Sequence, residues 1–434
     1  MKTIQKQLPQ VFVERDNGNL EDPFDGYFNN IEEWNTEPNG LLDSPSVYNW
    51  LGVINWGRKN NLYSYQQPFQ SKSGLRVTLN GKEYLMMSSY DYLGLIGHPK
   101  IEEAAASAIY KYGTGTGGVR LLTGTTSLHK KFEKGLAEFK GVEAAITFTS
   151  GYLANIGVIS SLLSPRDRII LDSKAHASIV QACKLAHVPV LRFEHNCMDS
   201  LEEKLKIKSQ SRRTLIVAEG IYSMDGDICH LPELIEIKKR YNAFLMVDEA
   251  HSFGVLGKYG RGVDEHFGIS ASEVDIWMGS LSKAIPSNGG FIAGKKEIII
   301  YLQHGASPFM FSAALNPASV AAASESLNIL KDEPNRLKKL HQNSAYLRYS
   351  LKELSLNTGD SVSPVIPVIL GEDEKAYRFA KALYNEGVFA SAIVKPAVSP
   401  GSARLRLCAT ARQNFEFIDE VINAFKKING IFIN

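Results

Sequence analysis

The stretch AAITFTSGYLANIG, residues 144–157, passes from a short apolar run into a Ser-Gly pair and then into a helical pattern. A run this short and apolar is typical of a strand that is covered on both faces. Ser150 is a favoured residue at a helix start, and the free N–H groups of a helix that begins at Gly151 offer a site for an anion. Simple capping of the helix by Ser150 explains the pattern equally well.

Further units of the same kind surround this stretch. Helices are predicted at 98–112, 127–140, 150–163, 176–187, 199–209 and 231–241, and strands at 144–149, 168–172, 189–193, 214–220, 244–248 and 275–280. Strands that alternate with helices in this way predict an α/β fold, with a mostly parallel sheet between helices.

The two ends of the chain differ from this central part. Residues 1–60 carry acidic and Asn-rich turns followed by YNWLGVINW, which predicts an N-terminal arm that docks through Trp50 and Trp56. Residues 61–95 contain Asn80-Gly81 between two strand-like runs, which indicates a hairpin.

The remaining chain is predicted to form two domains. We expect a large domain over 96–325 and a smaller C-terminal α/β domain over 330–434. In the smaller domain, strands are expected at 365–370 and 404–408, and a last helix at 414–428.

Composition and charge exclude several classes of protein. The 434 residues carry 48 Lys and Arg against 46 Asp and Glu, so the net charge of +2 gives no electrostatic case for nucleic acid. The four cysteines are too far apart for a zinc clamp and too few for a disulfide framework. The first residues lack the apolar core of a signal peptide. A cytoplasmic protein without a metal site is therefore expected.

Chemically versatile side chains follow two of the predicted strands. Asp248 ends one strand and His251 lies in the loop after it, while Lys283 follows another strand in SLSK, beside Ser280 and Ser282. Ligands bind at this edge of open α/β sheets, and a desolvated lysine there is a candidate amine nucleophile. Taken singly, each residue also has an ordinary explanation, such as a turn, a satisfied histidine or a solvated lysine.

Two other motifs are less specific. The run Gly113–Gly118 matches G-x-G-x-x-G, but it follows a predicted helix instead of a strand, so it indicates a connector with Gly113 as helix cap. Arg404 and Arg406 share one face of a predicted strand. They could grip a carboxylate or form the charged face of an edge strand.

Taken together and in this order, the motifs resemble those of the α-oxoamine synthases, a family of fold-type I pyridoxal-phosphate enzymes, and within it the bacterial serine palmitoyltransferases. The resemblance covers about residues 62–428. The motifs are YLGL (92–95), YGTGTGGVR (112–120), TSGY (149–152), D-x-x-x-H-A-S (172–178), EGIYSMDGD (219–227), VDEAHSFGVLG (247–257), SLSK (280–283) and RLRL (404–407).

This resemblance implies pyridoxal 5′-phosphate as cofactor and assigns roles to residues. Lys283 would form the Schiff base and later move protons, and Asp248 would pair with the ring nitrogen. His176 would stack on the ring, and His251 would reach its phenolic oxygen. The substrate carboxylate would be bound by Arg406, and Tyr90 would contact the substrate. The phosphate would be held by Ser150, Gly151, Tyr152, Ser280 and Ser282, together with Ser312 from the neighbouring subunit of a homodimer.

The implied reaction joins an amino acid to an acyl thioester, on coenzyme A or a carrier protein, with loss of carbon dioxide. The product is an α-amino ketone. Three residues depart from the family pattern, because Tyr90, Gln67 and Gln413 stand where Asn, Arg and His are usual. All three concern the substrate side, so we expect an altered amino acid, bulkier or sulfonated like cysteate, and a product that is a sphingoid-base-like or sulfonolipid precursor.

Two alternatives remain open at this point. Another fold-type I enzyme, such as an aminotransferase, would use the same Lys283 and Asp248. A non-catalytic partner subunit is the other, although the Schiff-base lysine is present. The aromatic stretch at 48–56 could touch a membrane or a carrier protein, but docking on the dimer is favoured.

Overall fold

The computed structural model describes residues 38–432. The chain forms two compact units. The large unit comprises Ser88–Val368 and Leu407–Ile422, and the small unit comprises the described residues of 38–87, 369–406 and 423–432. These bounds differ from the four-part division expected from the sequence, which stays a prediction.

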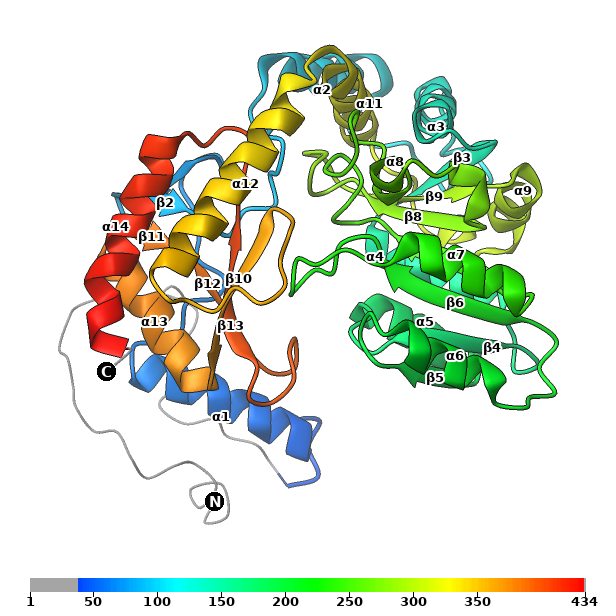
Figure 1. The fold of residues 1–434 in the computed structure, drawn as a ribbon. Coiled ribbons are helices and arrows are strands. Elements are labelled where there is room, and N and C mark those ends of the chain that lie inside the picture. The colour runs from blue at the N-terminus through cyan, green and yellow to red at the C-terminus, as the bar shows by residue number, and fades with distance from the viewer. Residues whose placement is uncertain (1–37, 433–434) are drawn as a thin grey trace. The chain divides into compact units, whose positions relative to one another are not determined.

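A seven-stranded sheet forms the centre of the large unit (Figure 1). In spatial order its strands are β3 (Ala144–Phe148), β9 (Gly290–Gly294), β8 (Ile276–Ser280), β7 (Phe244–Asp248), β6 (Thr214–Glu219), β4 (Arg168–Asp172) and β5 (Val190–Phe193). Neighbours from β8 to β5 pair in parallel, whereas β9 is antiparallel to both β3 and β8. The predicted mostly parallel α/β fold is confirmed.

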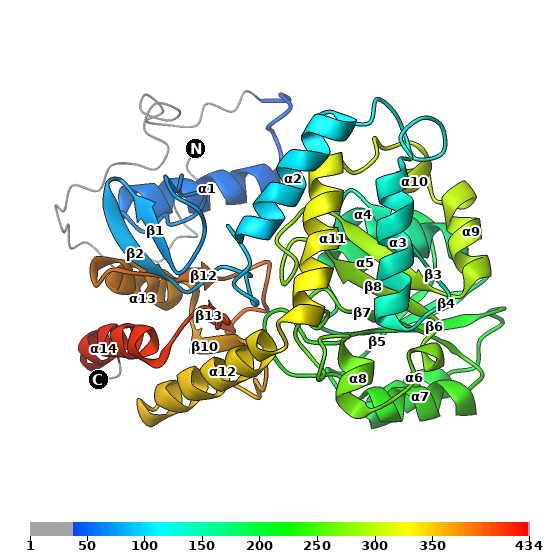
Figure 2. The same cartoon turned by 90° about the horizontal axis from the view of Figure 1, so that it is seen from above.

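Alternate residues of each strand enter separate cores on the two faces of this sheet. In β4, Ile169 and Leu171 join one core and Ile170 joins the other. The first core also holds side chains of α4 (Gly151–Leu162), α5 (Ala177–Ala186), α9 (Lys296–Gly305) and α10 (Ser307–Met310). The second holds side chains of α3 (Ser127–Lys140), α6 (Met198–Lys206), α7 (Leu231–Arg240), α8 (Val263–Phe267) and α11 (Pro317–Asp332) (Figure 2). Burial on both faces explains why the strands are almost wholly apolar.

Other helices complete the large unit. Helix α2 (Pro99–Tyr112) packs against α11, and α12 (Asn335–Glu353) follows α11 in the chain. A short 3-10 turn covers Ala271–Glu273, and α14 (Phe415–Phe432) ends the described chain. The helices and strands expected over 98–280 are all present, with bounds shifted by at most three residues. Among residues 38–432, no helix combines the length and apolar character that a membrane crossing needs.

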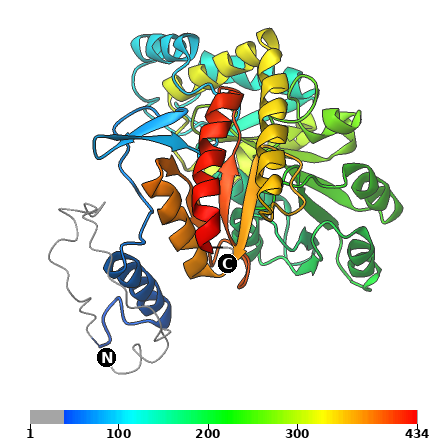
Figure 3. The ribbon, with the colours of Figure 1, turned by 60° about the vertical axis from the view of Figure 1, so that its left-hand side comes forward.

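Two further sheets, of three strands each, lie wholly or partly in the small unit (Figure 3). One consists of β1 (Arg76–Leu79), β2 (Lys82–Met86) and β11 (Val388–Phe389), and the other of β10 (Val365–Gly371), β13 (Ala403–Cys408) and β12 (Ser391–Ile393). Helix α13 (Asp373–Asn385) packs on β11 and β12. The predicted hairpin is confirmed, because β1 and β2 are antiparallel and Asn80 and Gly81 both have positive φ, as a tight hairpin turn requires.

The described part of the N-terminal arm is mainly helical. Pro45–Lys59 forms helix α1, and the Trp56 ring packs against Tyr377 with 6.1 Å between ring centroids. Trp50 is 53% exposed in the single chain, and the expectation that it docks on the dimer stays a prediction. Six residues along a helix turn by about 240°, and the two indoles therefore cannot share one face.

Candidate active site

Polar residues gather where the parallel strands of the large unit end. Asp172, Glu219, Asp248 and Ser280 are the last residues of β4, β6, β7 and β8. Glu219 and Asp248 are direct partners in the register of neighbouring strands. All four are buried. We call this side of the sheet the carboxyl edge.

Asp248 is held by two donors. Its Oδ2 accepts a hydrogen bond from Asn155 Nδ2 at 2.9 Å, and its Oδ1 accepts one from the N–H of Ala250 at 2.9 Å. Asn155 lies on α4 and also donates to Ser178 Oγ at 2.9 Å. Its own Oδ1 is buried without a hydrogen-bond partner among the described residues. Asn155 thus fixes the orientation of the carboxylate.

Lys283 follows the end of β8 by three residues, and its charge interacts with those of Asp248 and Glu219. Burial lowers the pKa of its ammonium group, and the nearby Asp248 and Glu219 carboxyls and Cys408 thiol offset only part of that effect. Burial and the Asp248 charge raise the pKa of Glu219 well above its ordinary value. A lysine with a lowered pKa is more often a neutral amine, which is the nucleophilic form.

Two histidines flank this group. His251 is 5% exposed, and its Nδ1 lies 2.7 Å from Tyr92 Oη, while the Tyr90 ring meets its ring edge-on at 5.9 Å between centroids. Burial, together with the charges of Lys283 and His176, holds the pKa of His251 well below its usual range. His251 is therefore neutral.

His176 precedes α5 and is exposed. Its backbone N–H donates to Glu219 Oε1 at 2.7 Å, and its Nδ1 lies 2.7 Å from Ser178 Oγ. Burial of the ring nitrogens lowers the pKa of His176. The structure therefore brings His176, Asp248, His251 and Lys283 into one electrostatic group at the carboxyl edge.

The residues of the same chain that are predicted to hold the phosphate lie where α4 begins and where β8 ends, and we call this group the anion cradle. Ser150 caps this helix by accepting the N–H of Leu153 at 3.1 Å, and Ser280 Oγ lies 2.9 Å from Ser282 Oγ. A Cβ added at Gly151 would stand 2.9 Å from the Met278 methyl group and 3.7 Å from Ser280 Cβ. Glycine therefore lets the helix start approach the end of β8 without a shift of the Met278 side chain.

Ser312 lies in the segment after α10, beside the glycine-rich connector. Its neighbour Ala314 donates an N–H to Gly118 O at 3.0 Å, and Ala313 bridges to Val119. Gly113, with φ of +85°, ends α2 as the sequence indicated. Nothing in the described large unit joins Ser312 to Ser280 directly, so its role stays a prediction.

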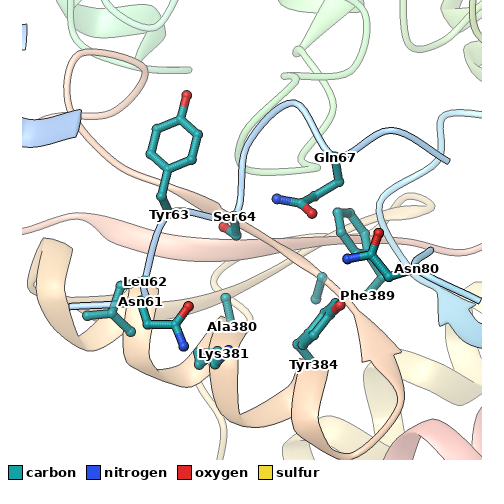
Figure 4. A pocket seen from close by; sticks show the side chains of 11 residues that line it. Asn61, Leu62, Tyr63, Ser64, Gln67, Asn80, Ala380, Lys381, Tyr384 and Phe389 are labelled. Atoms are coloured by element: carbon teal, nitrogen blue, oxygen red, sulfur yellow. The ribbon is translucent and has the colours of Figure 1, made fainter. Parts of the chain in front are cut away.

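Arg404 and Arg406 belong to the small unit. Both are buried on β13, the middle strand of its sheet, which excludes the charged outer face of an edge strand. Gln67 lines a cavity of about 50 Å³ in the same unit, with Ser64, Asn80 and aromatic rings around it (Figure 4). This volume holds a few water molecules and is far below the roughly 300–1,000 Å³ of a ligand pocket.

Gln413 has a local structural role. It is fully buried, and its Oε1 accepts the N–H of Thr410 at 3.0 Å, which closes a turn within the large unit. The expectation that it concerns the substrate stays a prediction.

Sequence reasoning quoted the motifs that contain Glu219, Asn155 and Tyr92 but gave these residues no role. Glu219 ends an apolar strand just as Asp248 does, so the strand-end rule could have found it. Tyr92 and Asn155 reach the site only through contacts across about 160 and 93 positions of sequence, and no local pattern reports those.

Comparison with known proteins agrees with this geometry. The family model for aminotransferase class I and II matches residues 82–425. The chain is 44% identical to the 8-amino-7-oxononanoate synthase of Thermoanaerobacter pseudethanolicus, over 86% of this chain and 94% of that protein. It is 41% identical to the serine palmitoyltransferase of Sphingobacterium spiritivorum, over 87% and 94%. The chain belongs to the α-oxoamine synthases.

Solved structures place this α-oxoamine synthase among the fold-type I enzymes. The serine palmitoyltransferase of Sphingomonas wittichii has a TM-score of 0.86 and 31% identity, over 91% of this chain and all of that one. A serine palmitoyltransferase solved with its pyridoxal-phosphate internal aldimine has a TM-score of 0.85 and 31% identity, over 91% and 99%. The predicted family, fold, enzyme class and pyridoxal-phosphate cofactor are confirmed.

Proposed function

We propose that this synthase joins an amino acid to a long-chain acyl thioester, with loss of carbon dioxide, to give a sphingoid-base-like or sulfonolipid precursor. The observation that carries the chemistry is the carboxyl edge, where the charges of Lys283, Asp248, His251 and His176 influence one another. When bound, pyridoxal phosphate supplies an electron sink for charge that develops at the α-carbon of the amino acid.

The residues present fit this cofactor. Lys283 supplies a neutral amine for the covalent link and a base that takes or returns a proton at the α-carbon. Asp248, oriented by Asn155, supplies the negative charge that keeps a pyridine nitrogen protonated. Neutral His251 would hold a hydrogen bond to the phenolic oxygen, and His176 would cover the ring.

The anion cradle would hold the phosphate. Its donors are the N–H groups of Gly151 and Tyr152 and the hydroxyls of Ser280 and Ser282. We further propose that Ser312 reaches the phosphate of a second copy, in a homodimer with shared sites. Mixed dimers of Lys283→Ala and Ser312→Ala chains, which contain one intact site, test this through partial recovery of activity. Recovery no greater than that of either homodimer would contradict shared sites.

On the substrate side we propose that Arg406 binds the amino-acid carboxylate and that Tyr90 contacts its side chain. The edge-on contact of Tyr90 with His251 supports a place beside the reacting atoms. Gln67 carries no charge, which favours an acyl chain without a terminal carboxylate. The similarity to solved serine palmitoyltransferases over nine-tenths of the chain supports the same view.

A second candidate has its own support. The 44% and 42% identities to 8-amino-7-oxononanoate synthases favour a short acyl chain that ends in a carboxylate. The two candidates differ in the acyl donor, so product formation separates them.

The test incubates holoenzyme with each pair from two sets of substrates. Glycine, alanine, serine and cysteate form one set, and palmitoyl-CoA and pimeloyl-CoA the other, with mass spectrometry of the amino ketone as readout. We expect turnover with palmitoyl-CoA and with serine or cysteate. Turnover confined to alanine with pimeloyl-CoA would overturn the long-chain assignment, and glycine as best partner would overturn the bulkier amino acid.

A further inference from the structure

A partly buried histidine outside the proposed site, His195, lies between two carboxylates. Its Nδ1 is 3.0 Å from Asp172 Oδ1, and its Nε2 is 3.0 Å from Asp227 Oδ2. Burial alone would lower the pKa of this imidazole, but the hydrogen bonds to Asp172 and Asp227 raise it to about 9. Both ring nitrogens therefore carry protons at neutral pH, and the ring is a cation with two anionic partners.

Asp172 is the centre of this arrangement. Besides His195, its carboxylate accepts hydrogen bonds from the N–H of Lys174 at 2.8 Å, the N–H of Asn196 at 2.9 Å and Tyr222 Oη at 2.9 Å. Burial raises the pKa of Asp172, but these contacts, with that of His195 first, lower it overall. The carboxylate is thus charged and its four lone-pair positions are occupied.

The cation ties together the segments that follow three neighbouring strands. Asp172 ends β4, His195 and Asn196 follow β5, and Asp227 lies in the segment after β6. Asn196 Nδ2 donates to Asp227 Oδ2 at 2.5 Å, and Lys174 Nζ pairs with Asp225 at 2.7 Å. These side-chain contacts therefore link segments that follow three different strands.

The turn from Asp172 to His176 is fixed at both ends by these contacts. At its start, the N–H groups of Lys174 and Ala175 bind the Asp172 side chain and carbonyl. At its end, the His176 N–H donates to Glu219. The His176 side chain itself is exposed, so its placement depends on the turn.

We propose that His195 is a positioning residue, whose ring between Asp172 and Asp227 fixes the turn at 172–176 and thereby the His176 ring. This inference rests on the proposed role of His176 against the cofactor. A loosened turn would let that ring adopt several orientations, so cofactor affinity and spectrum would change while the cofactor-linking lysine stays intact.

Two substitutions of His195 separate positioning from simple stability. The amide of His195→Asn matches the Nδ1 position and keeps a donor toward Asp172, whereas that of His195→Gln matches the Nε2 position and keeps only the donor toward Asp227. Both remove the charge, so both should destabilise the protein. Arg213→Ala is the matched control, because Arg213 pairs with the buried Asp167 at the opposite end of β4.

The measurements are the dissociation constant and visible absorbance of pyridoxal phosphate, and hydrogen exchange of the peptide that spans 172–178 in the cofactor-free protein. We expect His195→Gln to weaken cofactor binding about tenfold and to speed that exchange by a similar factor. His195→Asn should stay within about threefold of the wild type. Arg213→Ala should lower the melting temperature without changing either quantity.

Each outcome decides between possibilities. Exchange and cofactor affinity that change in His195→Gln no more than in Arg213→Ala would overturn the positioning role. If His195→Gln folds too poorly to bind cofactor, hydrogen exchange in His195→Asn decides. In that variant the peptide at 172–178 should exchange more slowly than the other loops, and exchange at the same rate or faster would contradict the proposal. His176→Ala with unchanged cofactor affinity and spectrum would instead refute the assignment of His176, separately from His195.

Discussion

The amino edge of the large sheet and the part of the carboxyl edge around Lys283 differ in how their charged groups are compensated. At the amino edge, where parallel strands begin, Asp167 receives two hydrogen bonds from Arg213 at 2.8 and 2.9 Å, and Asp275 binds Lys238 at 2.7 Å. The Arg213 guanidinium lowers the pKa of Asp167 to about 2. At the carboxyl edge, burial lowers the pKa of Lys283 and raises that of Glu219.

This difference separates groups that stabilise the fold from groups that are prepared for chemistry. A paired ion at the amino edge keeps its ordinary charge and contributes to folding. At the carboxyl edge, the lowered pKa of Lys283 and the raised pKa of Glu219 favour the neutral forms that nucleophilic attack and proton transfer use. Matched substitutions at the two edges should therefore have different effects on activity and on stability.

The largest effect is expected for the two lysines. Lys283→Ala should lower turnover by about 10³-fold or more, because it removes both the amine nucleophile and the base, while the melting temperature falls little. Lys238→Ala at the amino edge should do the reverse and leave turnover per folded molecule unchanged. Steady-state kinetics and thermal unfolding of both variants check this. Comparable activity losses in the two variants would remove the distinction between the edges.

The next largest effect is on stability at the amino edge. Arg213→Ala leaves Asp167, which is 1% exposed, without its charged partner, and we expect the free energy of unfolding to fall by about 1–3 kcal/mol. Cofactor affinity and kcat should not change. Urea denaturation with a parallel activity assay measures both, and a drop in kcat with unchanged stability would contradict the structural role of this pair.

A smaller effect is expected for Tyr92→Phe at the carboxyl edge. Loss of the hydroxyl leaves His251 Nδ1 without the partner that lies 2.7 Å away, so the tautomer of His251 is no longer fixed. We expect kcat to fall about tenfold and the pH profile of the cofactor absorbance to shift. An unchanged absorbance profile would show that Tyr92 does not act through His251.

The smallest effect concerns pH. The folded pKa of His195, about 9, exceeds its ordinary value of 6.5, so its contribution to stability is complete below about pH 6.5 and is lost as pH rises through 9. The Asp167 contribution has the opposite sign, because it is complete above pH 3.8 and lost as pH falls through about 2. The stability difference between wild type and His195→Gln should therefore shrink from pH 7 to pH 9.5. A constant difference across this range would contradict a charged His195.

Most strands and helices between residues 99 and 280 could be predicted, because each strand is a short apolar run and most of the helices carry an apolar period. Strand β9 was missed, since Gly290–Gly294 holds two glycines directly after a polar loop and its antiparallel place between β3 and β8 is set by long-range pairing. Lys283, Asp248 and His251 were found by position after strands. His195 and Asn155 were not, because their partners come from other strands and helices. Local patterns report where a strand ends but not what meets there.

The most direct test of the central claim is borohydride reduction of the holoenzyme followed by peptide mass spectrometry. We expect the reduced cofactor on Lys283, in the peptide that follows β8 at the carboxyl edge, and none on Lys238 at the amino edge. Cofactor on a different lysine, or a protein that binds no cofactor at all, would contradict the assignment of the carboxyl edge as the active site.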